Sequence, residues 1–231
     1  MAHRFWIIAA LASVAACAAI PQDTRYRPNI VAGDFKPIVD NPWFPLAPGT
    51  TYKYIESKDG ERSDVVTTIT NETKNILGVA CVVVHDVASH NGVIAEDTYD
   101  WYAQDKQGNV WYFGEDTKAY REGGKFSTEG SWQAGVDGAQ PGIVMPANPT
   151  PGSPYRQEYL AGHAEDMAQV VANNESVTVP YGAFVGALRT KEWSELEAGS
   201  NAKWYARGVG FIRSTSEDGE VAELVSVSKT P

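Results

Sequence analysis

The chain has 231 residues, of which 43% are hydrophobic, and its 29 acidic against 19 basic side chains give a net charge of −10. This length and apolar content suffice for one sizeable folded core. An acidic surface repels phosphate backbones and anionic lipid headgroups, which argues against nucleic acid as a partner, whereas neutral solutes, sugars and cations stay possible.

Residues 1–16 have the features of an export signal peptide. His3 and Arg4 give a basic start, Phe5–Val14 is an apolar run, and small residues lead into Cys17. The apolar run is shorter than the about 20 residues that span a bilayer. We therefore expect the chain to act outside the cytoplasm, in the cell envelope or the periplasm.

The end of this segment indicates how the chain is anchored. Val14-Ala15-Ala16-Cys17 resembles the lipobox of bacterial lipoproteins. The resemblance implies acylation of Cys17, with palmitate among its acyl chains, and a membrane partner reached through that lipid. Ala18 follows in place of Asp, which by the same resemblance favours the outer membrane. Ordinary signal-peptidase cleavage and secretion is the alternative.

The next segment is rich in proline, which breaks regular elements. We predict a lipidated tether over residues 17–40 and one β-rich domain over residues 41–231. The stretch Asn41–Leu46 is aromatic and apolar, so we expect it to pack on the domain and close one end of it.

From Thr50 onward, short strand-like runs alternate with turn signals. Asp59-Gly60, Asn91-Gly92 and Asp218-Gly219 predict tight hairpin turns. Residues 135–154 are rich in Gly and Pro and predict a long ordered loop. The one weak helix candidate covers residues 163–172. We predict strands over residues 51–57, 62–70, 79–88, 93–104, 110–115, 125–132, 155–160, 168–172, 175–179, 188–193, 202–206, 210–216 and 221–227.

Many short strands at regular spacing indicate an all-β fold with at most a minor helix. For one domain of this length, this pattern favours an antiparallel meander that forms an open or closed barrel-like sheet. In outline it resembles lipocalins and the half-open barrels of envelope lipoprotein carriers. Cys81 lies in a β-branched run, Val79–Val84, and is expected to be a buried core thiol.

Residues 96–117 concentrate the unusual side chains. Alternation places Asp100 and Tyr102 on one strand face and Trp101 on the other. On the following strand it places Trp111, Phe113 and Glu115 together, with Val110, Tyr112 and Gly114 opposite. Large aromatics on both faces predict either cover on both sides or a cavity lined on one side.

Three segments carry a resemblance. Asp100–Asp105 (DWYAQD), Gly108–Thr117 (GNVWYFGEDT) and Gly138–Pro146 (GAQPGIVMP) resemble motifs of a family of uncharacterised exported bacterial proteins. The likeness covers most of the chain from about Asn41. It implies export, and it carries over no catalytic residue.

Three kinds of chemistry are open to these residues. Asp100 and Glu115 among aromatic rings could act as general acid and base, because desolvation raises a carboxyl pKa. Tyr102 and His163 would assist, and Trp101, Trp111, Trp132 and Arg156 would bind the ligand or substrate. Ca²⁺ binding by the acids and transition-metal binding by His85, His90 and His163 are alternatives, but neither set has the spacing of a known site. We predict no metal.

The leading hypothesis is an envelope lipoprotein that binds a small or amphiphilic molecule in an aromatic-lined barrel. The rival is an extracytoplasmic, metal-independent lyase or hydrolase with paired carboxylates. A third possibility is an interaction protein without a pocket. The sequence has no nucleophile elbow, phosphate loop or dinucleotide fingerprint, so we expect no cofactor.

Overall fold

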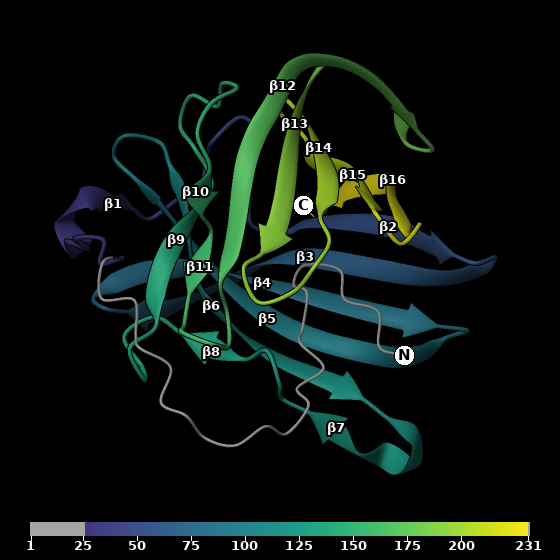
Figure 1. Cartoon of the computed structure of the whole chain (residues 1–231), viewed down its shortest axis with the longest axis horizontal. Helices are drawn as coiled ribbons and strands as arrows, with labels where there is room; N and C mark the ends of the chain where they lie inside the picture. The colour runs from purple at the N-terminus through teal and green to yellow at the C-terminus, as the bar shows by residue number, and fades with distance from the viewer. Residues whose placement is uncertain (1–25, 231) are drawn as a thin grey trace.

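A computed structural model describes residues 26–230 and consists almost wholly of β-strands (Figure 1). All sixteen described strands belong to one antiparallel sheet. The strands are β1 (Phe35–Lys36), β2 (Thr50–Lys58), β3 (Glu61–Ile76), β4 (Val79–His90), β5 (Val93–Asp105), β6 (Val110–Tyr120), β7 (Phe126–Ser127), β8 (Trp132–Gln133), β9 (Gln140–Met145), β10 (Tyr155–Arg156), β11 (Glu158–Tyr159), β12 (Asp166–Val179), β13 (Gly182–Ser194), β14 (Asn201–Ala206), β15 (Gly210–Ser216) and β16 (Val221–Lys229).

The main path of the sheet runs β10-β12-β13-β14-β15-β16-β2-β3-β4-β5-β6-β9-β11. It curls into a nearly closed barrel with two walls, a first wall of β2–β6 and a second wall of β12–β16 (Figure 1). The predicted all-β, barrel-like meander is therefore confirmed. Within residues 26–230 the helical content is two 3₁₀ turns, Ala32–Asp34 and Glu122–Gly124.

The predicted turns form with the backbone that their residues favour. Asp59 and Gly60 have φ of 53° and 83°, and Asn91 and Gly92 have φ of 51° and 77°. Two consecutive residues with positive φ match the right-handed twist of the strands that they join. The weak helix candidate over residues 163–172 does not form: β12 begins at Asp166 and contains the predicted strand 168–172, because pairing with β13 outweighs a weak local helix preference.

The two ends of the sheet meet at one short segment. Tyr155–Arg156 pairs with β12, and directly after Gln157 the pair Glu158–Tyr159 joins β9. At Gly142 on β9, a Cβ would lie 2.3 Å from the carbonyl carbon of Gln157. Glycine therefore permits the close backbone approach that closes the barrel.

The segment from Val39 to Leu46, called the plug here, closes one end of the barrel beside the β5–β6 and β14–β15 turns, and its Asn41–Leu46 part lies as predicted. Trp43, Phe44 and Leu46 are buried. The Phe44 ring lies 5.4 Å from the ring of Tyr102 on the first wall and 6.4 Å from that of Tyr205 on the second. Packing begins earlier in the chain than residue 41, since Phe35 contacts Trp111 and Phe113.

Candidate functional site

The plug leaves a half-open pocket against the first wall. About 410 Å³ of empty space, part of it continuous with solvent, lies among aromatic and aliphatic side chains. Its lining comes from the plug, from β2–β5 and from the start of β15, and its main rings are those of Phe44, Tyr52, Tyr54, Tyr102 and Phe211. The lining is mostly apolar with a few placed polar groups, which is the composition of small-molecule sites.

One carboxyl group, that of Asp100, lies in this apolar lining. It is 2% exposed, and burial raises its pKa to about 7. The Tyr112 hydroxyl donates a hydrogen bond of 2.6 Å to Asp100 Oδ1, which favours the charged form and limits the rise. The group therefore changes charge near neutral pH, as a general acid or a ligand-binding carboxyl requires.

The structure brings the predicted acid pair together. Asp100 on β5 and Glu115 on β6 are direct cross-strand partners, and both are buried. Tyr102 lies beside them, with its ring stacked 4.9 Å from that of Tyr112. Trp132 packs edge-on against Tyr112 at 5.4 Å. Four predicted site residues thus share one interior region.

Tyr112 belongs to this group because strand alternation fails at one position. β5 advances two residues from Asp100 to Tyr102 while β6 advances three from Glu115 to Tyr112. Gly114, with φ of 125°, forms the bulge, and a Cβ there would lie 2.2 Å from the carbonyl oxygen of Trp132. The prediction that Tyr112 and Glu115 face opposite sides is therefore wrong.

Trp101 and Trp111 lie elsewhere. Trp101 is on the other face of β5, where Lys74 Nζ lies 3.2 Å from its ring centroid. Trp111 donates from Nε1 to Asp105 Oδ2 at 2.9 Å and packs against Phe35. Lys74 and Phe35 therefore cover these two rings on the outer face of the sheet. Of the two predictions made for strands with aromatics on both faces, cover on both sides is the one that describes this region.

Arg156 and His163 are also apart from Asp100. Arg156 pairs with Glu195 at 2.5 Å, and its guanidinium lies 4.8 Å from the ring of Tyr159. His163 is exposed, with Nε2 3.2 Å from the backbone oxygen of Ser131. Neither contacts the acid pair.

Further carboxyl groups line the interior of the first wall. Glu56 on β2 is 3% exposed, and burial, reinforced by nearby Glu220, Asp86 and Glu96, raises its pKa to about 9. Asp86 on β4 accepts a hydrogen bond of 3.0 Å from Thr67. Glu56 is therefore protonated at neutral pH.

A second half-open pocket lies across Phe44, against the second wall, with about 380 Å³ of empty space. Here Glu192 forms a buried ion pair with Lys203, Oε2 to Nζ 2.7 Å. Glu192 Oε1 also accepts hydrogen bonds from Thr190 at 2.8 Å and Tyr205 at 3.1 Å. Phe44 and Tyr102 line both pockets, so the plug ring divides one interior space into two.

Sequence reasoning missed the residues that hold the plug. Gln104 Oε1 accepts hydrogen bonds from the backbone N–H groups of Asp40 and Asn41, both at 2.8 Å. The Asn41 amide donates to the backbone oxygens of Gly108 at 2.8 Å and Pro146 at 3.2 Å. These contacts come from the three motif segments, which occupy adjacent strands β5, β6 and β9. Their polar residues therefore position the plug.

Among residues 26–230, no three His, Cys, Asp or Glu side chains are grouped so as to hold a metal ion. In the same range, no helix has the length and hydropathy needed to cross a membrane. Cys81 is buried, as predicted, and burial raises its pKa to about 12, which keeps the thiol protonated. Cys17 and the export signal lie outside the described residues.

Two solved structures show similarity to the chain. One is a candidate exported protein with a YMCC-like fold from Bacteroides fragilis, 16% identical with a TM-score of 0.49. The other is a candidate lipoprotein from Parabacteroides distasonis, 13% identical with a TM-score of 0.44. Each alignment covers 81% of this chain and 99% of the other. No family model and no curated protein matches the sequence, so function is argued from the chain's own residues.

Proposed function

We propose that this protein is a cell-envelope lipoprotein that binds a small or amphiphilic molecule in the pocket beneath the plug. The observation that carries the proposal is the half-open pocket of aromatic rings with a single titratable carboxyl, Asp100, in its wall. Aromatic rings supply a large apolar contact area, and the carboxyl supplies one directed polar contact. The export-signal features and Cys17 support the proposed location and lipid anchor. The three motif segments support the proposed relation to the family of exported proteins.

The arrangement of the two pockets indicates how a ligand would lie in the interior. They meet at Phe44, which is on the plug and not on the barrel. A ligand with an apolar body enters the tyrosine-lined side as the Phe44 ring moves, and its polar end reaches Asp100. The hydrogen bonds of Gln104, Asn41 and the Phe44 and Leu46 N–H groups hold the plug backbone in place while the Phe44 ring moves.

Titration with the fluorescent neutral amphiphile N-phenyl-1-naphthylamine tests this proposal. Val84 lines the pocket, so Val84→Phe fills it, whereas Val87 on the same strand points outward and Val87→Phe is the matched control. We expect Val84→Phe to weaken probe binding at least tenfold and Val87→Phe to leave it within twofold. Equal binding by the two variants, or none by the parent chain, would overturn the proposal.

A second candidate function is acid–base catalysis by the cross-strand pair. Its supporting observation is that Asp100, with a pKa raised to about 7, lies directly opposite Glu115. A protonated Asp100 would donate to a leaving group while Glu115 accepts a proton, in a lyase or hydrolase reaction without metal. Tyr112, which contacts Asp100, takes the assisting place predicted for His163.

The test of catalysis is an activity screen over esters, glycosides and polyuronides. The variants are Asp100→Asn, Glu115→Gln and their combination, and Glu61→Gln on an exposed strand end is the control. We expect turnover to fall about 100-fold or more in each single variant. Turnover that is unchanged in the double variant would remove this function and leave the binding proposal intact.

A further inference from the structure

A hairpin at one rim of the barrel differs in charge from the rest of the molecule. It comprises residues 118–127, the end of β6, the Glu122–Gly124 turn and β7. Within these ten residues are three cations, Lys118, Arg121 and Lys125, and one acid, Glu122. On a chain of net charge −10, this rim hairpin has an excess of basic side chains, with Glu96 and Asp97 opposite it on β5.

The same hairpin exposes aromatic rings. Phe126 is 52% exposed and Tyr120 is 36% exposed. The two are cross-strand partners, and their rings contact edge-on at 6.1 Å. Lys118 Nζ lies 6.0 Å from the Phe126 ring centroid, so cation and rings form one surface.

An exposed apolar pair lies at the same rim on the neighbouring hairpin, with Val93 on the face of Tyr120 and Ile94 on the face of Arg121. Val93 is 70% exposed and Ile94 is 48% exposed, at the start of β5. Glu96 on β5 pairs with Ala119 on β6, so Ile94 reaches the level of Arg121. Four large apolar side chains and three cations therefore gather at one rim.

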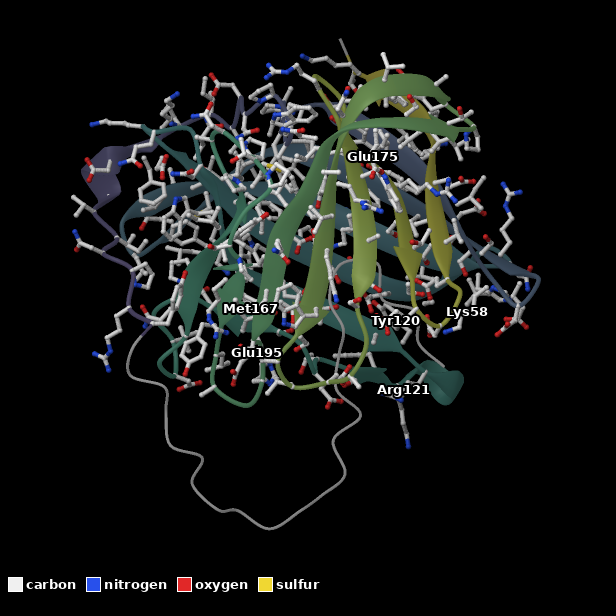
Figure 2. The ribbon with its side chains drawn as sticks, turned by 45° about the horizontal axis from the view of Figure 1, so that its top comes forward. Lys58, Tyr120, Arg121, Met167, Glu175 and Glu195 are labelled. Atoms are coloured by element: carbon white, nitrogen blue, oxygen red, sulfur yellow. The ribbon has the colours of Figure 1, made fainter. Side chains whose placement is uncertain are left out.

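The pictures show that this rim is free of other elements. In Figure 1 the β7 hairpin extends beyond the barrel, beside the β4–β5 turn. Figure 2 shows the Arg121 side chain projecting away from the body. No described strand packs over the tip.

We propose that this rim docks on an anionic lipid bilayer, with Phe126, Tyr120, Val93 and Ile94 in the headgroup region and the three cations on lipid phosphates. Aromatic rings at the interface and adjacent basic residues are the two contributions that hold peripheral proteins on such surfaces. A soluble polyanion would engage the cations but would gain nothing from four exposed apolar side chains. The combination of both favours the bilayer.

Vesicle flotation of the full chain tests the proposal, with phosphatidylcholine vesicles compared with vesicles containing one-third phosphatidylglycerol. Every variant carries the same N-terminus, so any anchor contributes equally and the anionic-to-neutral binding ratio reports the rim alone. We expect Lys118→Gln/Arg121→Gln/Lys125→Gln to lower this ratio at least tenfold, since each cation near the surface contributes about fivefold. The control Lys53→Gln/Lys191→Gln/Lys229→Gln, at exposed positions elsewhere, changes net charge equally and should leave it within twofold.

A second pair of variants separates lipid from other anionic partners. Tyr120→Ser/Phe126→Ser should weaken binding to anionic vesicles at least threefold, and Tyr181→Ser/Val185→Ser, on the exposed β12–β13 hairpin, should not. An equal ratio in the parent chain and the rim's basic variant would overturn the proposal. A second result would also overturn it: the aromatic variant binds vesicles normally, and dextran sulfate displaces the parent chain from them. That result would identify a soluble polyanion as the occupant.

Discussion

The two walls of the barrel bury the same kind of side chain and neutralise it differently. On the second wall, Glu192 has a cation, Lys203, at 2.7 Å and two hydroxyl donors. On the first wall, Glu56 and Asp100 take part in none of the ion pairs formed between described residues. Their pKa values are raised to about 9 and about 7, mainly by burial.

The difference separates a structural use of buried acids from a titratable one. On the second wall Lys203 balances the charge of Glu192, whereas burial raises the pKa of Asp166 on β12 to about 7. A carboxyl neutralised by a proton changes state when pH or a ligand changes. Asp100 on the first wall and Asp166 on the second are therefore buried carboxyl groups that can respond to a bound molecule.

The largest effect is expected from Lys203→Met, which makes the second wall resemble the first. The side chains of Lys203 and Glu192 are 10% and 7% exposed, so removal of the cation leaves a buried, uncompensated carboxylate. We expect a loss of about 3 to 5 kcal/mol in the free energy of unfolding. Urea denaturation at pH 7 measures it.

The double variant Lys203→Met/Glu192→Gln is the control for this experiment. It removes both charges, so at least half of the lost stability should return. A loss below about 1 kcal/mol in the single variant would mean that the pair is not buried as described.

The next effect has the opposite sign and concerns Glu56 on the first wall. With a folded pKa of about 9 against an ordinary value of 4.5, the folded state binds more protons than the unfolded state between these pH values. Stability therefore falls as pH rises through that window. Glu56→Gln removes the penalty and should stabilise the protein by about 2 kcal/mol at pH 8 and by little at pH 4.5.

Denaturation midpoints at the two pH values measure this effect. Glu61→Gln, exposed at the other side of the same turn, removes the same charge and should show no such pH dependence. Destabilisation by Glu56→Gln at pH 8 would contradict a protonated Glu56.

The smallest effect is expected from Tyr112→Phe. Loss of the 2.6 Å hydrogen bond to Asp100 removes the contact that favours the charged carboxylate, so the pKa of Asp100 should rise above about 7. We expect a loss of about 1 to 2 kcal/mol at pH 8, where Asp100 is ionised, and less at pH 5.

Tyr54→Phe is its matched control, because the Tyr54 hydroxyl donates to a neutral group, the backbone oxygen of Phe211, at 3.2 Å. Its loss should be the same at both pH values. If the loss of stability depended on pH in the same way for both variants, Tyr112 would have no influence on the titration of Asp100.

Much of the fold follows from local signals in the sequence. Asp-Gly and Asn-Gly pairs predict the hairpins, β-branched runs predict the strands, and the aromatic stretch Asn41–Leu46 predicts burial at one end of the barrel. Each of these depends on residues adjacent in the chain, which is why they could be predicted. Residues 163–172 were the exception, since there strand pairing outweighs local preference.

The site was predicted only in part, because side-chain direction depends on register. The pairing of Asp100 with Glu115 was anticipated, but the contact of Tyr112 with Asp100 was not. A bulge at Gly114, required by the nearby backbone of Trp132, turns Tyr112 inward. Tyr54 and Phe211 line the pocket from distant parts of the chain, and no local sequence pattern predicts that they come together.

The short segment Tyr155–Tyr159 has a consequence for assembly of the protein. Without it, β9 and β12 would be exposed edge strands, which pair readily with strands of other molecules. The two-residue strands β10 and β11 cap these edges, β10 on β12 and β11 on β9. Until this segment is in place, both edges are open to pairing with strands of other molecules.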